Sequence, residues 1–298
     1  MSVRDIALAV FVVALWGLHV VIIRIGALEI PPLLLLGIRY AIVLGAAAFF
    51  FQRLAPPKIK AIALYAFPYL VLHLGTIFIG LRYIEAGVGG LILQTEVPFA
   101  ILLGWIFYRE KFGIKTAFGL FLAFLGVLMI IYKPGAPVEN FSYFGALTLL
   151  ASSFFWAVGS LRMRYIDGVD FWSMTFYSHL IALPFIVLFS ALFESNHLQE
   201  LQQANWTTLG FVLFYQTVLM TLCLYWWKGL MVRNHAYKVT IFMLLQPVFS
   251  VMCSIIILHE TFDLMTIKGG LITLLGVAVV TLRKARKAQN LETEQEKP

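Results

Sequence analysis

Ten apolar runs of helical length divide the sequence, and they constrain its fold more than any other feature. They lie at about residues 5–25, 33–51, 62–81, 87–107, 114–132, 143–163, 172–192, 207–227, 238–258 and 267–282. About 20 apolar residues span the hydrocarbon core of a bilayer, and a backbone in lipid must satisfy its own hydrogen bonds. The sequence therefore predicts an all-α integral membrane protein with ten transmembrane helices.

Composition excludes the main alternatives to a helical membrane protein. Hydrophobic residues make up 61% of the 298 residues and charged residues 12%, whereas soluble domains carry about 25% charged residues. A transmembrane β-barrel is excluded because its strands alternate between lipid-facing and lumen-facing residues and so lack unbroken apolar runs. The first run is too long for a secretion signal and no Ala-x-Ala cleavage site follows it, so we expect it to stay attached.

The basic residues are distributed unevenly among the connections between the predicted spans. With a cytoplasmic N-terminus, 17 of the 22 Lys and Arg residues fall on the inner side and four on the outer side. Because short cytoplasmic loops are enriched in Lys and Arg, both termini are predicted to be cytoplasmic, with Lys58 and Lys284 inside and Lys133 outside. The net charge of +7 thus reflects membrane orientation, and no nucleic-acid partner is expected.

The two halves of the sequence resemble each other at a nearly fixed offset. The matching segments are 14–24 with 154–164 at an offset of 140, and 104–112 with 253–262 and 119–127 with 269–277 at an offset of 150. Because each half has five spans, an odd number, the second half must enter the membrane in the opposite sense. The sequence predicts two inverted five-helix repeats, residues 1–135 and 136–282, and a cytoplasmic tail, residues 283–298. Inverted repeats are typical of secondary transporters.

Several short motifs mark the first half, and most of them have a counterpart in the second half. They are Trp16-Gly17, Arg39-Tyr40, the Pro98 segment ending in Arg109-Glu110 and the Gly119–Gly126 helix, with second-half counterparts at Trp156, Glu260, Gly269 and Gly276. On these motifs, residues 5–282 resemble the ten-helix EamA-type transporters of the drug/metabolite transporter superfamily. The segment LILQTEVPF is similar to the fourth helix of bacterial exporters of amino acids and cysteine-pathway metabolites. The resemblance implies export, and the chain departs from the pattern at Glu96 and at His259.

Glu96 is the leading candidate for function because it lies about ten residues into a predicted span. Inserting an acidic side chain there costs about 2.5 to 3.5 kcal/mol on translocon scales, so such residues usually face a cavity or a partner. Glu96 is therefore a candidate substrate-binding residue and proton carrier. The alternative is a hydrogen-bonded acid that only ties helices together.

Prolines interrupt the corresponding fourth and ninth spans, one residue out of register. Pro98 cannot donate to the carbonyl of Gln94, and Pro247 similarly frees the carbonyl of Met243. Paired interruptions in two halves of a transporter point to a binding site near the membrane midplane, where Gln94 and Gln246 would supply neutral polar groups. A packing kink is the alternative.

Two pairs of aromatic and polar residues occur in the first and sixth spans. Trp16 and His19 share one face of the first span, and Trp156 and Ser160 lie four residues apart in the sixth. Aromatic walls with a few polar groups suit a small organic solute, so all four are candidate substrate-binding residues. Either Trp could instead belong to the aromatic belt at the membrane surface.

The remaining intramembrane polar residues are expected to be largely structural. Glu110 and Glu260 end the fourth and ninth spans, where they could gate or could anchor a helix end or pair with a basic loop residue. Arg39 is predicted near the outer third of the second span, snorkelling or binding helix-end carbonyls. His73 and His179 are expected to be hydrogen-bonded within the fold.

Glycines at seven-residue spacing mark the fifth and tenth spans. Gly119 and Gly126 share one helix face, as do Gly269 and Gly276, and small residues allow helices to approach closely in membranes. We expect these faces to pack, with a dimer contact or a hinge in each half left open.

The residue types favour a transporter over an enzyme. A membrane-embedded enzyme would need a nucleophile beside a base, paired metal-binding acids or a Gly-x-Ser-x-Gly motif, and the only close acid pair, Asp167 and Asp170, lies in a loop. An ATP-driven pump would need a phosphate-binding loop, which the chain lacks. No cofactor or metal is expected, because Cys223 and Cys253 fall in apolar spans and behave as small apolar residues.

Charge within the spans narrows the substrate. A sugar-phosphate exchanger would need several buried basic residues, and a small-cation exporter a mid-span acid in the first and sixth spans. Neither is present, so the predicted function is export of a small neutral or zwitterionic metabolite, an amino acid or a derivative, across the inner (plasma) membrane by alternating access. Another metabolite or a drug-like compound is the alternative, and a membrane enzyme the less favoured one. The expected partners are the substrate and membrane lipid, with a homodimer left open.

Overall fold

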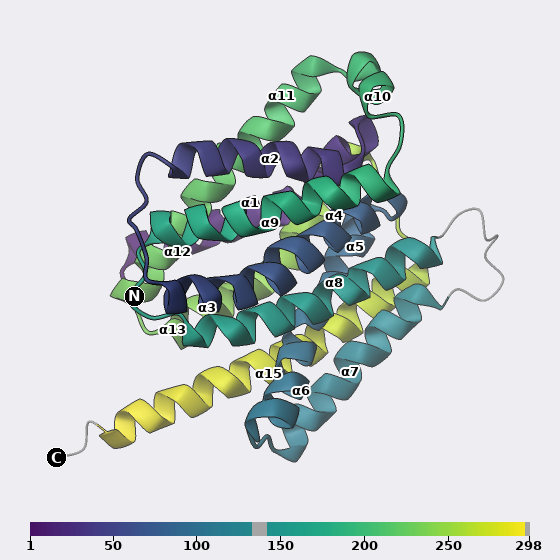
Figure 1. Ribbon diagram of the computed structural model, residues 1–298. Helices are drawn as coiled ribbons and strands as arrows, with labels where there is room; N and C mark the ends of the chain where they lie inside the picture. The colour runs from purple at the N-terminus through teal and green to yellow at the C-terminus, as the bar shows by residue number, and fades with distance from the viewer. Residues whose placement is uncertain (133–141, 296–298) are drawn as a thin grey trace. The chain divides into compact units, whose positions relative to one another are not determined.

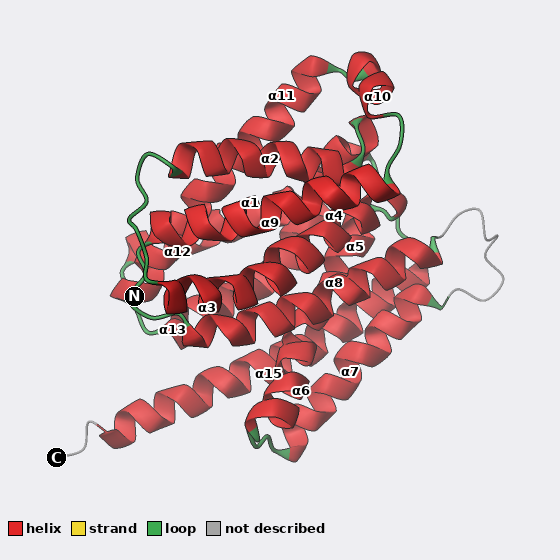
Figure 2. Cartoon of the chain, in the orientation of Figure 1, coloured by secondary structure: helices red, strands yellow, loops and turns green. Residues whose placement is uncertain are grey.

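The computed structural model describes residues 1–132 and 142–295, and every regular element within them is a helix (Figures 1 and 2). The predicted Lys133-Pro134-Gly135 turn lies outside the described residues. Nine helical stretches of the described residues are long and apolar enough to cross a membrane: Val3–Glu29, Pro56–Tyr83, Ala86–Tyr108, Ile114–Ile131, Tyr143–Tyr165, Phe171–Phe193, Trp206–Arg233, Ala236–Leu258 and Leu264–Arg283. A further apolar helix, α2 (Pro32–Ala47), has 16 residues.

Some of these stretches are single helices and others combine several elements. The simpler ones are α1 (Val3–Glu29), α7 (Ile114–Ile131), α8 (Tyr143–Arg162) with a 3₁₀ turn (Met163–Tyr165), α9 (Phe171–Phe193) and α15 (Leu264–Gln295). The short helix α10 (His197–Gln203) lies in the connection after α9. The stretch Pro56–Tyr83, the third predicted span, joins α3 (Pro56–Ala66), a π-helical segment (Phe67–His73) and α4 (Leu74–Tyr83). The stretch Trp206–Arg233, the eighth predicted span, joins α11 (Trp206–Phe214), a π-helical segment (Tyr215–Leu219) and α12 (Met220–Arg233). Both π-helical segments thus fall in corresponding spans of the two predicted repeats.

The second predicted span is too long at its C-terminal end. The apolar run continues to Phe51, but α2 ends at Ala47 and residues 48–50 form a turn. Its phenylalanines pack on the start of α9, with ring centroids of Phe51 and Phe176 3.9 Å apart and those of Phe50 and Trp172 4.9 Å apart. An apolar turn that packs on a neighbouring helix has the same composition as a helix in lipid, so hydrophobicity alone overextended the span.

Local sequence signals fix many helix ends. Proline opens α2 and α3, where the missing N–H has no helical acceptor in any case. The Asp170 carboxylate accepts a hydrogen bond from the Ser173 N–H (2.9 Å) at the start of α9. Partial burial raises the pKa of Asp170, but hydrogen bonds from Ser173 and from the backbone N–H groups of Trp172 and Asp170 together lower it more, so the net pKa lies below its usual value.

The chain divides into two compact units, and each draws on both halves of the sequence. Unit 1 contains Met1–Val21, Glu85–Asn140 and Met220–Pro298. Unit 2 contains Ile22–Ile84 and Phe141–Leu219. The predicted repeats of residues 1–135 and 136–282 therefore do not coincide with the compact units.

Within unit 1, α7 and α15 lie side by side and cross at glycines (Figure 1). A Cβ atom on Gly119 would lie 2.9 Å from the Gly276 oxygen, and one on Gly269 would lie 2.6 Å from the Gly126 oxygen. Because the earlier glycine of α7 meets the later glycine of α15, the two helices run antiparallel here. The prediction that these glycines allow close packing is confirmed.

Within unit 2, a carboxylate and a second glycine pair hold the helices. Glu194, after the last residue of α9, accepts hydrogen bonds from the N–H groups of Leu33 (2.7 Å) and Leu34 (3.0 Å) in the first turn of α2. The helices α4 and α8 approach where a Cβ on Gly80 or Gly145 would lie 3.2 Å from the other glycine's oxygen. The stretch from Glu194 to Asn205, predicted only as a polar connection, thus starts with an anchor for α2 and includes α10.

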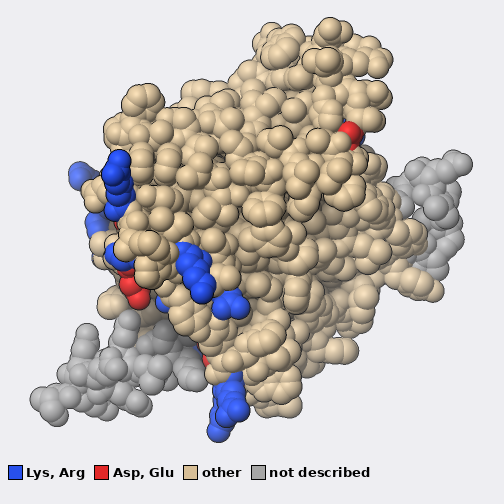
Figure 3. All heavy atoms as spheres, viewed as in Figure 1, with Lys and Arg blue, Asp and Glu red and all other residues tan. Residues whose placement is uncertain are grey.

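Large apolar side chains are exposed along most of the helices. Phe107, Leu128 and Leu275 have 71%, 60% and 61% of their surface accessible. On the face visible in Figure 3, few side chains over the helices are charged. Such surfaces suit a lipid environment, where exposed apolar groups carry no penalty.

Candidate substrate-binding site

The fourth and ninth predicted spans are both interrupted by 3₁₀-helix, and both lie in unit 1. In the fourth, α5 (Ala86–Ile92) leads into a 3₁₀ segment (Leu93–Thr95) and then α6 (Glu96–Tyr108). In the ninth, α13 (Ala236–Thr240) leads into a 3₁₀ segment (Ile241–Leu245) and then α14 (Gln246–Leu258). Short 3₁₀ stretches within a helix often mark functional hinges.

Glu96 and Gln246 occupy the same place in these two stretches. Each is the first residue of the helix after the interruption, and the two are 150 residues apart, as are Glu110 and Glu260. Both side chains are partly exposed, and no described residue forms a hydrogen bond or an ion pair with the Glu96 carboxylate. An N-terminal helix position favours a negative charge and polar acceptors. The sequence analysis compared the prolines of the two halves and did not predict that Glu96 in the first half corresponds to Gln246 in the second.

The prolines follow directly in the first turns of the two helices. Pro98 and Pro247 are buried in α6 and α14. Gln94 lies within the 3₁₀ segment before Glu96, and its side chain is partly exposed. Since the first N–H groups of a helix have no intrahelical acceptor, a proline in this turn helps to end the preceding segment and start a new helix.

The structure brings the first span to Gln246 within unit 1. A Cβ atom on Gly17 of α1 would lie 2.8 Å from the Gln246 main-chain oxygen and 2.9 Å from the Ser250 nitrogen. The neighbouring Trp16 packs on Trp227 of α12, with ring centroids 4.8 Å apart. His19 follows on α1 and is partly buried. The first span thus packs on the start of α14 beside Trp16, and His19 lies three residues further along α1.

The other predicted pair, Trp156 and Ser160, belongs to α8 in unit 2. Both side chains are partly buried, and the Ser160 hydroxyl donates a hydrogen bond to the Ala157 carbonyl (2.9 Å) on its own helix. That bond satisfies the hydroxyl donor of Ser160 and leaves its oxygen lone pairs as acceptors.

The two glutamates at the helix ends have different surroundings. Glu260 accepts hydrogen bonds from the N–H groups of Ala86 (2.7 Å) and Gly87 (2.9 Å), the first two residues of α5. Glu110 is exposed and its carboxylate lies against Gly104. Each follows a residue in the left-handed region, Arg109 (φ 54°) or His259 (φ 53°). The anchoring role expected as the alternative for Glu260 is therefore present, while gating stays a prediction.

Both predicted intramembrane histidines are hydrogen-bonded within unit 2. His73 lies within the first π-helical segment, and its Nδ1 is 3.1 Å from the Ser152 carbonyl oxygen and 2.8 Å from the Ser152 hydroxyl. His179 of α9 has Nδ1 2.8 Å from the Thr175 carbonyl oxygen. The prediction of hydrogen-bonded histidines is confirmed. Sequence reasoning missed the π-helical segments, for which Pro68 is the one local signal in the first and nothing comparable exists in the second.

The prediction for Arg39 is wrong. Arg39 is the eighth of the 16 residues of α2 and so lies at the middle of the helix, not in its first third. Its side chain is only 8% exposed, so it does not snorkel. Its Nε and Nη1 atoms are buried without any hydrogen-bond partner, so they do not bind helix-end carbonyls.

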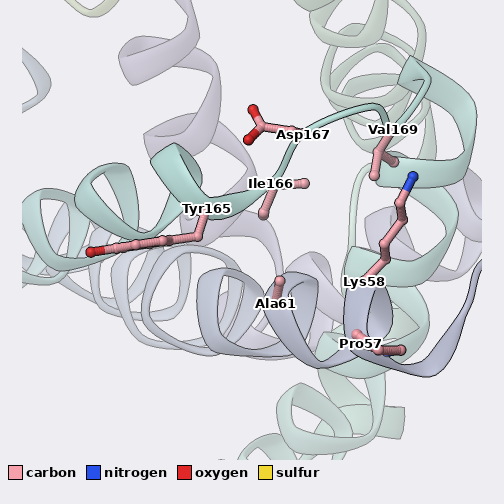
Figure 4. A pocket seen from close by; sticks show the side chains of 7 residues that line it. All are labelled: Pro57, Lys58, Ala61, Tyr165, Ile166, Asp167 and Val169. Atoms are coloured by element: carbon pink, nitrogen blue, oxygen red, sulfur yellow. The ribbon is translucent and has the colours of Figure 1, made fainter.

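A shallow pocket in unit 2 lies away from all of these residues. It has a volume of about 240 Å³ and lies between the start of α3 and the segment before α9 (Figure 4). Lys58 reaches across it and donates a hydrogen bond to the Gly168 carbonyl (2.9 Å). Because Lys58 is already engaged and the pocket lies at the ends of two membrane-spanning stretches, Pro56–Tyr83 and Tyr143–Tyr165, it does not compete with the interrupted helices as a transport site.

Known proteins resemble this chain along nearly its whole length. The EamA-like transporter family matches residues 4–132 and 143–282. A probable amino-acid metabolite efflux pump of Salmonella typhimurium (strain LT2) is 30% identical over 289 residues, covering 94% of this chain and 95% of the relative. A probable amino-acid metabolite efflux pump of Escherichia coli (strain K12) is 28% identical over 297 residues with the same shares covered.

A solved crystal structure shares the fold. It aligns with 94% of this chain and 99% of its own chain, with a TM-score of 0.61 and 16% identity. Together with the apolar helices, the family match makes this a multi-pass protein of the plasma membrane. The chain belongs to the EamA-like transporter family.

Proposed function

We propose that the protein exports a small neutral or zwitterionic metabolite, an amino acid or a derivative, by alternating access with proton coupling at Glu96. Membership of a transporter family supports transport and not catalysis. The names of the Salmonella and Escherichia coli relatives support export and the substrate class.

The observation that carries the proposal is the paired interruption of the fourth and ninth spans. Two helices begin inside apolar stretches with polar residues at equivalent positions, Glu96 and Gln246. Discontinuous helices at corresponding places in two repeats form the substrate site in many secondary transporters. We therefore assign substrate binding in unit 1 to Gln94, Glu96 and Gln246, with Trp16 and His19 of the first span as further candidates.

The antiparallel glycine contacts support inverted repeats. At the offset of 150 residues, Gly119 corresponds to Gly269 and Gly126 corresponds to Gly276. Exchanging the two halves therefore maps the contact between Gly119 and Gly276 onto the contact between Gly269 and Gly126. A parallel repeat would pair equivalent residues instead. We propose that the two halves alternate their conformations to open the site to each side in turn.

Purified protein in liposomes tests the function directly. Liposomes loaded with an unlabelled amino acid should take up the labelled form by exchange, and empty liposomes should not. A native-state ligand also raises thermal stability by mass action, so the same amino acid should raise the melting temperature. Failure of a broad set of amino acids and derivatives in both assays would contradict the proposed substrate class.

Cysteine labelling tests the orientation of the chain. In a background with Cys223 and Cys253 replaced by serine, Lys58→Cys should react with a membrane-impermeant maleimide only after cells are opened. Lys268→Cys should react in intact cells, since both lysines are exposed and lie on opposite sides in the inverted topology. Labelling of Lys58→Cys in intact cells would overturn the cytoplasmic placement of the termini.

A further inference from the structure

Arg39 is a buried cation without a counterion. It lies in the middle of α2 in unit 2, with 8% of its surface accessible. Its Nε and Nη1 atoms have no hydrogen-bond partner, and no carboxylate of the described residues forms an ion pair with it. An arginine cannot escape this situation by losing its proton. An uncompensated buried charge is strongly destabilising, so its presence calls for a partner from outside the chain.

The side chains around Arg39 are polar or aromatic but supply no negative charge. Tyr40, Tyr69 and His179 lie near it. The Tyr40 hydroxyl is engaged with the Leu70 carbonyl (2.7 Å), and His179 with the Thr175 carbonyl (2.8 Å). The rings of Tyr40 and His179 pack edge to face, with centroids 4.8 Å apart. This arrangement holds the neighbours in place and leaves the guanidinium donors unused.

The segment that carries Tyr69 is itself irregular. Phe67–His73 is π-helical, and Tyr69 stacks on Tyr65, with ring centroids 5.1 Å apart, while also contacting His73. Single π-helical turns within α-helices are frequent at functional sites. A π-helical segment, aromatic side chains and an unpaired guanidinium therefore occur within one unit.

We propose that Arg39 forms a second binding position for the transported solute, within unit 2, and that it binds a single carboxylate of the solute there. The identity of the ligand rests on the proposed function, whereas the carboxylate chemistry rests on the geometry of unit 2. A guanidinium donates two parallel N–H···O bonds to a carboxylate. One positive charge balances a monoanion, such as the carboxylate of a zwitterionic amino acid, but would leave a phosphate dianion half neutralised.

Pairs of acids and amides test the carboxylate. L-leucine and L-phenylalanine should protect the wild-type protein against thermal unfolding at concentrations about 10- to 100-fold lower than their C-terminal amides, as expected for one charge-assisted contact. Arg39→Gln should weaken protection by the acids by that factor and leave the amides unchanged, while Arg39→Lys should restore part of the preference. Arg53→Gln, at an exposed arginine of the same unit, should behave as wild type.

Stability of the ligand-free protein provides a second readout. Arg39→Gln should raise the melting temperature without ligand, because it removes an unpaired buried charge. An arginine with only a structural role would give the opposite result. Equal protection by acids and amides in the wild type, or an equal loss of both in Arg39→Gln, would overturn the proposal.

Simple carboxylates separate this proposal from the proposed function. Suppose that no amino acid is exchanged or bound. If acetate and benzoate then protect the wild-type protein, acetamide and benzamide do not, and the protection is lost in Arg39→Gln, the carboxylate site is supported and amino-acid export is contradicted. Absence of protection by every acid would overturn the Arg39 site itself. The measurement is repeated with and without anionic lipid. If the acids protect the protein only in the absence of that lipid, an acidic lipid headgroup occupies the site. That result would contradict the transported solute as the source of the carboxylate.

Discussion

Replacing Glu96 by glutamine is expected to reduce proton-driven transport to the level of empty liposomes while exchange of internal for external substrate continues. Glutamine keeps the shape and the polar oxygen of the side chain but cannot carry a proton. The backbone accepts it, since Gln246 starts α14 where Glu96 starts α6. The measurement compares uptake of labelled substrate under an imposed pH gradient with counterflow in the absence of a gradient.

Two matched variants define the outcome for Glu96. Glu96→Asp keeps an ionisable group and should retain gradient-driven uptake, although a shorter side chain will lower its rate. Glu200→Gln removes a partly exposed carboxylate that pairs with Arg82 at 3.5 Å and should have wild-type transport, since surface ion pairs contribute little. Undiminished gradient-driven uptake by Glu96→Gln would show that the proton is carried elsewhere.

Replacing Gly126 by alanine is expected to destabilise the protein by about 3 kcal/mol, toward the upper end for overpacked sites. The added Cβ would overlap the Gly269 oxygen and lie 2.5 Å from the Thr273 nitrogen. Both are backbone atoms of α15, which cannot rotate away as a side chain can. Alanine gains about 1 kcal/mol in helix propensity over glycine, which is too little to offset the clash. Thermal unfolding in detergent should therefore occur at a clearly lower temperature.

The chain offers matched glycines for comparison. Gly45 in α2 and Gly210 in α11 have no atom within 4 Å of an added Cβ, so Gly45→Ala and Gly210→Ala should leave stability unchanged or slightly raised. The contrast separates the loss of a close helix approach from any general effect of removing a glycine. A wild-type melting temperature for Gly126→Ala would mean that α7 and α15 do not rely on this approach.

Most of the helical architecture follows from hydrophobicity, because lipid imposes one simple rule on every span. Nine of the ten predicted runs have a long apolar helix in the described residues. The exception, α2, ends early because Phe50 and Phe51 pack on α9 and not into lipid. The C-terminal end of α2 thus depends on contacts with a distant segment, which the local sequence pattern does not show.

The candidate site was predictable only where chemistry shows in the sequence. Glu96 could be predicted because inserting an acidic side chain into a membrane costs free energy, and the glycine faces could be predicted from their seven-residue spacing. Glu260 could be identified as an anchor only with its partners, the N–H groups of Ala86 and Gly87, which lie more than 170 residues away. The prediction for Arg39 was wrong for the same reason, since its lack of a partner depends on the π-helical segment Phe67–His73 and on α9 as well as on α2.

The crossing of α7 and α15 has the symmetry of a dimer interface. Each glycine contact is the image of the other when the halves are exchanged, as each contact of a two-fold dimer occurs twice. We therefore expect α7 and α15 to pack together without a covalent connection between the fifth and sixth spans. A gene cut at that connection should yield two separate five-span chains that reassemble across it when both are made in the same membrane.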